Sequence, residues 1–456
     1  MTPAFHCRAC GSLAGRPVLD LGLQPLANNL PRPEDLGRTE PRFPLRLAVC
    51  ESCWMLQITD IVPPVELFSE YLYFSSFSDA MLRHARLAAE QHIASEQLNA
   101  GSFVVEVASN DGYLLRNFVE AGIPCLGIEP ATNIAQVATK KGIPTLNRFF
   151  TLDLARQLVS PPSEGRVPSP GIPHPISVGP APSPGTASEG RVPSPGAPDP
   201  HSPPPASRAD LILGNNVFAH VPDTNDFVAA LAALVKPTGR IVLEFPYACD
   251  LVEHLEFDTI YHEHVFYFTL TSLIPLFARH GLDVVDVERI PIHGGSLRFS
   301  AAPTGSRPVA DSVRRLLAEE TAKGVASHAY YEAFAGKVHA LRTQLLELLR
   351  DLRAKGHRVA AYGASAKGST LLNFYGIGRD GLDGLEFVAD RSTAKQGRLT
   401  PGSHLPIVPP SELLARRPDF ALLLTWNFAE EILAQQQEYR AAGGRFILPV
   451  PSVRIV

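Results

Sequence analysis

Short apolar strands alternate with helices in two separate stretches of the chain. In the first, FVVEVASN (103–110) and CLGIEP (125–130) have the pattern of buried strands, and a helix follows each of them. The second alternation runs from residue 357 to residue 456. Because alternation of this kind is typical of a parallel sheet covered by helices, we expect an α/β protein with two Rossmann-like units.

A segment rich in proline, serine and glycine interrupts the first alternation. It covers residues 160–207 and contains SEGRVPSPG twice, at 163–171 and 188–196. Such a segment buries too little apolar surface to offset the entropy of ordering it. The strand pattern resumes afterwards with ADLILGNNVFAHV (209–221). We therefore interpret 160–207 as a disordered insertion with no part in the chemistry of the protein.

Two CxxC pairs lie near the N-terminus, Cys7/Cys10 and Cys50/Cys53. Four thiolates from two tight turns form the tetrahedral site that a structural Zn²⁺ prefers. The alternatives are a reactive dithiol or free core cysteines, but two matched pairs favour zinc. We expect a small zinc-binding module here, while Cys125 and Cys249 have the apolar surroundings of core residues.

Composition excludes several classes of partner. The formal net charge is −5 and charged residues make up 19% of the chain, so nothing favours nucleic acid or an anionic membrane as a partner. No apolar run approaches the ~20 residues that span a bilayer. The start, MTPAFHCRACG, lacks the features of a signal peptide. We expect a cytoplasmic protein.

The segment VVEVASNDGYLL (104–115) predicts a site for an adenosyl cofactor. A strand ends in an acidic residue, and a loop of small residues leads into a helix, so that the backbone can approach a ligand. Glu129 ends the next strand, where its carboxylate can bind the ribose hydroxyls. Since ASNDG has fewer glycines than a pyrophosphate loop, S-adenosylmethionine is favoured over NAD, and a turn without ligand is the third possibility. The expected cofactor-binding residues are Glu106, Ala108, Asn110, Asp111, Gly112, Glu129, Pro130 and Asn215.

Other polar residues follow predicted strands or turns. In GNNVFAHV (214–221), Asn216 and His220 would line the crevice at the carboxyl ends of the strands, although the pair of asparagines can be a cap and His220 a core residue. In IHGGSLRF (292–299), Ser296 and Arg298 could hold an anion such as a diphosphate, with a plain hairpin as the alternative.

The second α/β unit contains a degenerate phosphate-binding loop. YGASAKGSTLLNF (362–374) joins a strand to a helix but matches neither common phosphate-binding glycine pattern. Lys367 could still supply positive charge for a phosphate, and Asp390 ends the next strand as in a dinucleotide fold. We favour a nucleotide-like fold without its own cofactor over a true NAD site.

The segment DTIYHEHVFY (258–267) concentrates Tyr261, His262, Glu263 and His264 in four positions. A strand would place Tyr261 and Glu263 on one face, whereas a turn or helix would bring Tyr261 and His264 together. A histidine oriented by a carboxylate suits acid–base chemistry. A metal site and a polar strand remain possible from the spacing alone.

These motifs occur together in one order: CRACG…CESCW, YLYFSSFSD, EVASNDGYLL, GNNVFAHV, FDTIYHEHVFYF, HGGSLR and YGASAKGSTLLNF. The chain thereby resembles the three-domain S-adenosylmethionine-dependent sugar C-methyltransferases, except in the 160–207 insertion. The resemblance implies a zinc-binding module (1–62), a class I methyltransferase domain (63–303) and a helical connection with a Rossmann-like substrate-binding domain (304–456).

The resemblance also implies the substrate and the catalytic residues. The substrate would be a nucleotide-linked 4-keto-deoxysugar, with thymidine diphosphate as the carrier, methylated on the carbon beside the ketone, C3. His264 would be the base and Glu263 would orient it. Tyr261, Tyr73 or His220 would donate a hydrogen bond to the enolate oxygen. His262 has no assigned role, and we expect a monomer.

Three other functions compete with this interpretation. An NAD-dependent nucleotide-sugar epimerase or dehydratase would use the 357–456 unit, and a methyltransferase could also act on a different keto acceptor. A scaffold without enzymatic activity would use the zinc module and the second α/β unit to bind a protein.

Overall fold

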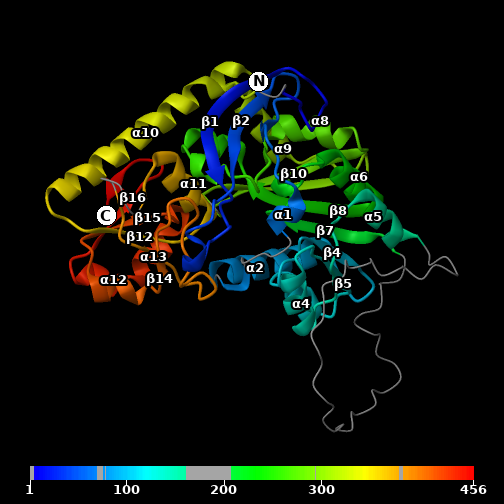
Figure 1. Cartoon of the computed structure of the whole chain (residues 1–456). Coiled ribbons are helices and arrows are strands. Elements are labelled where there is room, and N and C mark those ends of the chain that lie inside the picture. The colour runs from blue at the N-terminus through cyan, green and yellow to red at the C-terminus, as the bar shows by residue number, and fades with distance from the viewer. Residues whose placement is uncertain (1–4, 69–74, 78, 161–206, 293, 379–383) are drawn as a thin grey trace, which may run out of the picture.

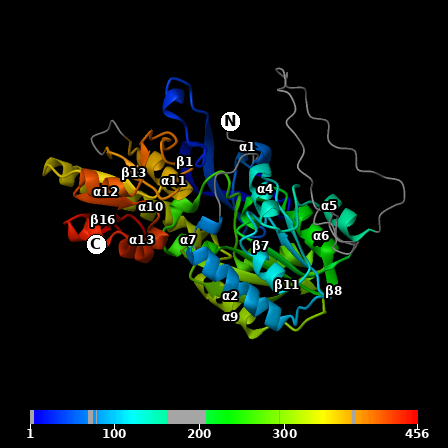
Figure 2. The same cartoon turned by 90° about the horizontal axis from the view of Figure 1, so that it is seen from below.

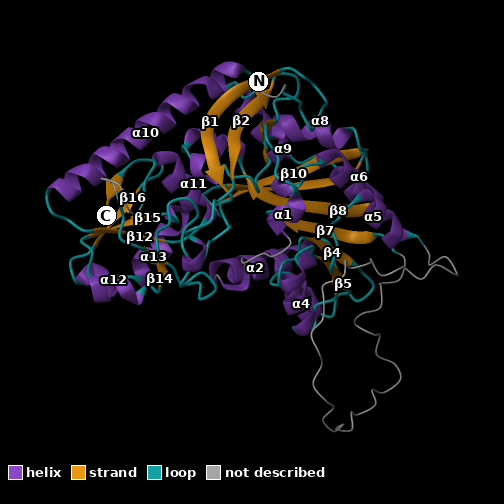
Figure 3. Cartoon of the chain, viewed as in Figure 1, coloured by secondary structure: helices purple, strands orange, loops and turns teal. Residues whose placement is uncertain are grey.

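The computed structural model describes residues 5–68, 75–77, 79–160, 207–292, 294–378 and 384–456. Tyr73 lies outside these residues, as does the predicted insertion apart from its two end residues. The described elements form three sheets, with the C-terminal sheet on one side, the central sheet on the other and the N-terminal strands between them (Figures 1 and 3). Among the described helices, none combines the length and the apolar character needed to cross a bilayer.

The N-terminal sheet is antiparallel and includes a strand from the middle of the chain. Its order is β1 (Gly15–Pro25), β2 (Arg42–Cys50), β3 (Leu56–Ile58) and β9 (Phe266–Tyr267). β9 pairs with β3 through Leu56↔Tyr267 and Gln57↔Phe266. Because β9 directly follows the YHEH segment, the N-terminal sheet fixes one end of that segment.

The central sheet has the alternation predicted from the sequence. Its order is β10 (Leu282–Ile290), β11 (Ser296–Pro303), β8 (Val235–Pro246), β7 (Ala209–Asn215), β4 (Val104–Val107), β5 (Cys125–Ile128) and β6 (Thr145–Leu146). The strands from β8 to β6 are parallel, and β11 is antiparallel to both of its neighbours. The carboxyl ends of β4, β5 and β7 therefore meet at one edge, where a parallel sheet binds ligands.

Helices cover the central sheet and connect it to the rest of the chain (Figure 2). They are α1 (Pro64–Phe68), α2 (Asp79–Ser95), α3 (Leu115–Glu120), α4 (Thr132–Lys140), α5 (Leu152–Val159), α6 (Thr224–Leu234), α7 (Ala248–Glu253), α8 (Leu270–Ala278) and α9 (Asp311–Lys323). α6 ends at Leu234, and the next residue, Val235, begins β8 by pairing with Ala209.

The C-terminal unit is a second, smaller parallel sheet. Its order is β14 (Ile407–Val408), β13 (Val388–Ala389), β12 (Val359–Tyr362), β15 (Phe420–Leu423), β16 (Arg445–Leu448) and an antiparallel β17 (Arg454–Ile455). Its helices are α11 (Ala366–Tyr375), α12 (Ser411–Arg416), α13 (Ala429–Gln435) and α14 (Gln437–Ala441). The long α10 (His328–Ala354) runs along this unit and leads into it (Figure 1).

The central and C-terminal units meet through the 3₁₀-helix η4 (Phe257–Thr259), just before the YHEH segment. Indole Nε1 of Trp426 donates to the buried Asp258 carboxylate at 2.7 Å. The rings of Phe257 and Tyr375 stack with centroids 5.1 Å apart. The C-terminal unit therefore fixes the other end of the YHEH segment.

The buried carboxylate of Glu320 anchors α9 to the start of α8. It accepts hydrogen bonds from the Leu270 and Thr271 backbone N–H groups at 2.7 Å each, and from the Tyr247 hydroxyl at 2.7 Å. One side chain thus satisfies two of the N–H groups that a helix start leaves without partners.

We expect Glu320→Ala to lower the free energy of unfolding by about 3 kcal/mol, because several buried donors would lose a charged acceptor. Urea denaturation followed by circular dichroism measures this change. The neighbouring exposed Glu319→Ala is the matched control and should change stability by less than about 0.5 kcal/mol. Equal effects of the two substitutions would contradict this role of Glu320.

Candidate active site

A cavity of about 720 Å³ lies where all three sheets approach one another. Asn28 from the N-terminal module, the loops after β4, β5 and β7, the YHEH segment and the start of α11 contribute to its wall. The predicted site residues that line it are Ala108, Asn110, Glu129, Pro130, Asn215, Asn216, His220, Tyr261, His264 and Lys367. Folding therefore brings ten predicted site residues, from separate parts of the sequence, to the wall of one cavity.

The loop after β4 has the backbone shape of a glycine-rich loop despite its sequence. Ala108, Asn110 and Gly112 have positive φ angles of 54°, 50° and 78°. A side chain at Gly112 would place its Cβ 2.7 Å from Ile143, so glycine is required there by both conformation and space. The left-handed turns leave Ala108 and Asn110 facing the cavity.

Glu129 is positioned by two backbone N–H groups at the end of β5. The N–H of Ala131 donates to one carboxylate oxygen at 2.8 Å, and the N–H of Asn110 donates to the other at 3.0 Å. Burial raises the pKa of Glu129, although these two hydrogen bonds oppose the shift. Each oxygen keeps a lone pair that can accept a ligand hydroxyl.

Three expected cofactor residues support the loop from behind instead of lining the cavity. Gly112 forms the turn, and Asp111 binds the Lys141 ammonium at 2.8 Å and the Ser76 hydroxyl. Glu106 is fully buried, and burial, with Glu129 and Asp111 nearby, raises its pKa well above the usual range.

The YHEH segment forms a turn, so of the conformations considered from the sequence it adopts the one that pairs Tyr261 with His264. The His264 N–H donates to the Tyr261 carbonyl at 2.8 Å, and the Tyr261 hydroxyl lies 2.8 Å from His264 Nε2. His264 Nδ1 lies 2.9 Å from the Thr259 carbonyl, which can only accept. Nδ1 therefore carries the proton, and in the neutral ring Nε2 has the lone pair that a base requires, here facing the Tyr261 hydroxyl.

His220 approaches the same pair from 3₁₀-helix η3 (Phe218–His220). Its ring centroid lies 4.8 Å from that of His264. Burial lowers the pKa of His220 to about 4, against a hydrogen bond to the Asn216 carbonyl that raises it. His220 is therefore neutral near pH 7. Behind it, the stacked rings of Phe218 and Phe268, 4.4 Å apart, hold η3 in place.

The two middle residues of the YHEH segment face the N-terminal module, which corrects the expected role of Glu263. The Asn28 amide donates to both Glu263 carboxylate oxygens, at 2.7 and 2.8 Å. The group at His264 Nδ1 is the Thr259 carbonyl, so a main-chain atom orients His264 in place of the expected carboxylate. His262 Nε2 lies 3.2 Å from the Pro44 carbonyl in β2.

Arg298 and Ser296 do not line the cavity, contrary to expectation. The Arg298 guanidinium pairs with Glu244 and Glu288, at 2.7 Å each, in a separate small pocket beside α2. The Ser296 hydroxyl donates to the Ile292 carbonyl at 3.0 Å. β11 places both residues within the sheet, where existing partners occupy their polar groups.

The C-terminal unit contributes positive charge to the cavity. Lys367 lies in the first turn of α11 with its ammonium 4.8 Å from the centroid of the Trp426 ring. Burial lowers the pKa of Lys367, while Asp258 and Glu256 oppose that shift. Lys395 also lines the cavity and donates to the Ala364 carbonyl at 2.7 Å.

Sequence reasoning missed Asn28, Thr259 and Lys395. Asn28 lies in PLANNL (25–30), a polar loop between the two CxxC pairs, and its pair of asparagines was the available signal. Thr259 acts through a main-chain carbonyl, for which its residue type gives no signal.

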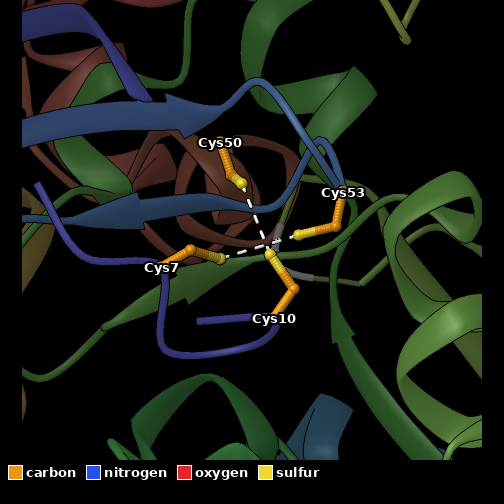
Figure 4. A group of neighbouring side chains, drawn as sticks. All are labelled: Cys7, Cys10, Cys50 and Cys53. Atoms are coloured by element: carbon orange, nitrogen blue, oxygen red, sulfur yellow. Dashed lines mark hydrogen bonds between the residues drawn. The ribbon is translucent and has the colours of Figure 1, made fainter. Parts of the chain in front are cut away.

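The four predicted zinc ligands form one cluster (Figure 4). Their sulfur atoms lie within 4.8 Å of one another, with 3.6 Å between Cys7 and Cys53 and between Cys10 and Cys50. A tetrahedron with Zn–S bonds of about 2.3 Å needs sulfurs about 3.8 Å apart, so the cluster fits Zn²⁺. Figure 4 shows the side chains converging from two turns.

Comparisons with known proteins match every part of this architecture. A zinc binding domain family matches residues 7–68, a methyltransferase domain family residues 81–287, and a C-methyltransferase C-terminal domain family residues 291–451. The chain is 34% identical over 455 residues to C-methyltransferase NovU of Streptomyces niveus, covering 100% of this chain and 97% of that protein.

Solved structures resemble about half of the chain. Magnesium protoporphyrin IX methyltransferase from Synechocystis PCC 6803 is 11% identical, with a TM-score of 0.30 over 49% of this chain and 79% of that chain. The 1,6-didemethyltoxoflavin-N1-methyltransferase of Burkholderia thailandensis is 16% identical, with a TM-score of 0.31 over 50% and 80%.

We expect the purified protein to contain close to one zinc per chain by elemental analysis. Cys50→Ser should lose most of this zinc, because a structural site needs all four ligands. Cys125→Ser is the matched control, since Cys125 lies in β5 away from the cluster, and it should keep its zinc. A full zinc content in Cys50→Ser would refute the four-thiolate site.

Proposed function

The chain belongs to the S-adenosylmethionine-dependent C-methyltransferases, and we propose that it methylates C3 of a nucleotide-linked 4-keto-deoxysugar. The observation that carries the proposal is the oriented His264. Its Nε2 lone pair and the Tyr261 hydroxyl lie together on the wall of a cavity shared by the cofactor loop and the C-terminal unit. Carbon beside a ketone becomes a nucleophile only after losing a proton, and this pair suits that step.

His264 is the proposed base. Its Nδ1–H is held by the Thr259 carbonyl, which leaves Nε2 to remove the proton from C3. The same contact stabilises the imidazolium that forms, because the carbonyl dipole points at the charged ring. The Tyr261 hydroxyl, which meets Nε2 in the resting structure, can then donate to the developing enolate oxygen.

His220 is a second proposed donor to the enolate. Since burial keeps its imidazole neutral, it can hydrogen-bond the oxygen without protonating the enolate carbon. Its ring lies beside His264, so both can reach one small substrate. Tyr73, the third expected donor, lies outside the described residues.

The loop after β4 and Glu129 are the proposed cofactor site. Glu129 would accept the two ribose hydroxyls, and the left-handed turns at Ala108 and Asn110 would let the backbone approach the ligand. S-adenosylmethionine supplies an electrophilic methyl group when bound. The chain's task is to hold the enolate carbon beside it, where effective molarities can lower barriers by about 7–11 kcal/mol.

The C-terminal unit is the proposed site of the nucleotide diphosphate. Lys367 and Lys395 face the cavity at the start of α11, where helix dipole and cations both favour an anion. Asp390 already accepts from the Ala364 and Ser392 N–H groups at 2.7 Å each, which supports a fold without its own NAD.

Four further expectations stay predictions. They are the thymidine carrier, the monomeric state, the cytoplasmic location and the domain limits at 62/63 and 303/304.

The catalytic assignment is tested by proton exchange at C3 of thymidine-diphosphate 4-keto-6-deoxyglucose in D₂O, followed by NMR. We expect His264→Ala to slow enzyme-dependent exchange and methyl transfer by about 10²–10⁴-fold. His262→Gln is the matched control, because it keeps a donor towards Pro44 and does not line the cavity. Exchange at the wild-type rate in His264→Ala would exclude His264 as the base.

The cofactor assignment is tested by calorimetry with S-adenosylhomocysteine. We expect Glu129→Ala to weaken binding by about 10- to 100-fold, since hydrogen bonds to a charged acceptor would be lost. Glu120→Ala, at an exposed end of α3, should bind as the wild type does. Tight binding of NADH in place of the adenosyl ligand would contradict the proposed site.

A further inference from the structure

The N-terminal module contributes to the reaction cavity as well as to the fold. Asn28, in the loop between β1 and β2, lines the same cavity as Tyr261 and His264. Its side-chain nitrogen donates to both oxygens of Glu263, at 2.7 and 2.8 Å. Glu263 is 3% exposed and does not line the cavity, so Asn28 lies between this carboxylate and the substrate space.

This contact fixes which end of the Asn28 amide is available to a ligand. A carboxylate has no hydrogen to donate, so the NH₂ group must face Glu263 and the carbonyl oxygen must point elsewhere. Within the part of the chain that the structure describes, Oδ1 of Asn28 has no hydrogen-bond partner. Asn28 therefore offers a hydrogen-bond acceptor of fixed orientation to the cavity.

The backbone around Asn28 is held as firmly as its side chain. The Leu30 N–H donates to the Asn28 carbonyl at 3.0 Å, which closes the turn. The next residues contact the C-terminal unit, with the Leu399 N–H donating to the Pro31 carbonyl at 2.9 Å. Arg398 donates to the Leu30 carbonyl at 3.2 Å. A preorganised acceptor loses little entropy on binding a ligand.

We propose that Asn28 contacts the acceptor substrate directly and accepts a hydrogen bond from one of its hydroxyl or amino groups. Glu263 is the positioning residue that holds the Asn28 amide in this orientation. The inference rests on the proposed function, because it concerns the substrate of the same cavity. A half-buried acceptor of fixed orientation favours substrates with a donor at that position and disfavours analogues that lack one.

The first test compares Asn28→Ala with the wild type on thymidine-diphosphate 4-keto-6-deoxyglucose. We expect KM for the sugar nucleotide to rise about 10-fold or more, with little change in kcat or in affinity for S-adenosylhomocysteine. Asn29→Ala is the matched control, because Asn29 is exposed and does not line the cavity. A KM for Asn28→Ala within twofold of the wild-type value would overturn the proposal.

The second test exchanges the two partners. Asn28→Asp alone places two carboxylates in contact and should raise KM further than Asn28→Ala. In the double variant Asn28→Asp/Glu263→Gln, the glutamine amide can donate to one aspartate oxygen and leave the other as an acceptor in the cavity. We expect this variant to recover KM to within about fivefold of wild type, whereas a purely structural role predicts no recovery.

These outcomes separate the inference from the proposed function. Failure of the wild type to methylate the sugar nucleotide would contradict the proposed function itself. A wild type that is active, together with a double variant no better than Asn28→Asp, would overturn the role of Asn28 alone.

Discussion

The pairing of β9 with β3 is the constraint on which the geometry of the candidate site depends. β9 begins two residues after His264, and the Ile58 N–H donates to the Val265 carbonyl at 2.9 Å. On the other side, η4 is tied to the C-terminal unit through Asp258 and Trp426. The YHEH turn is thus held at both ends, by the N-terminal sheet and by the C-terminal unit, and this fixes the positions of Tyr261 and His264 on the cavity wall.

Burial influences the protonation state of the side chains on the cavity wall. His220 is neutral because its charged form would lose solvation, and Lys367 keeps two acidic neighbours that oppose the same effect. In such an environment each fixed dipole acts more strongly than it would in water. The Thr259 carbonyl, the Tyr261 hydroxyl and the Asn28 amide can therefore orient groups without a net charge of their own.

Local patterns predicted much of the fold and part of the site. The alternating apolar runs predicted two mainly parallel sheets, and the paired CxxC turns predicted the four-sulfur cluster. The loop at Ala108 was predicted to bind the cofactor although it lacks two glycines, because Glu106 and Glu129 indicated it, and the structure gives this loop the backbone shape of a glycine-rich turn. Arg298 was misplaced because the sequence does not reveal that Glu244 and Glu288 would pair with it.

The sequence by itself determined which chemical groups are present and which strand ends they follow. The reason is that the alternation of side chains along a strand and the composition of the following loop depend only on neighbouring residues. Only the tertiary structure decided which members of one motif face the cavity. Tyr261 and His264 reach the cavity, whereas His262 and Glu263 turn to Pro44 and Asn28. The physical reason is that these partners lie more than 200 residues away, and long-range sheet pairing alone brings them into contact.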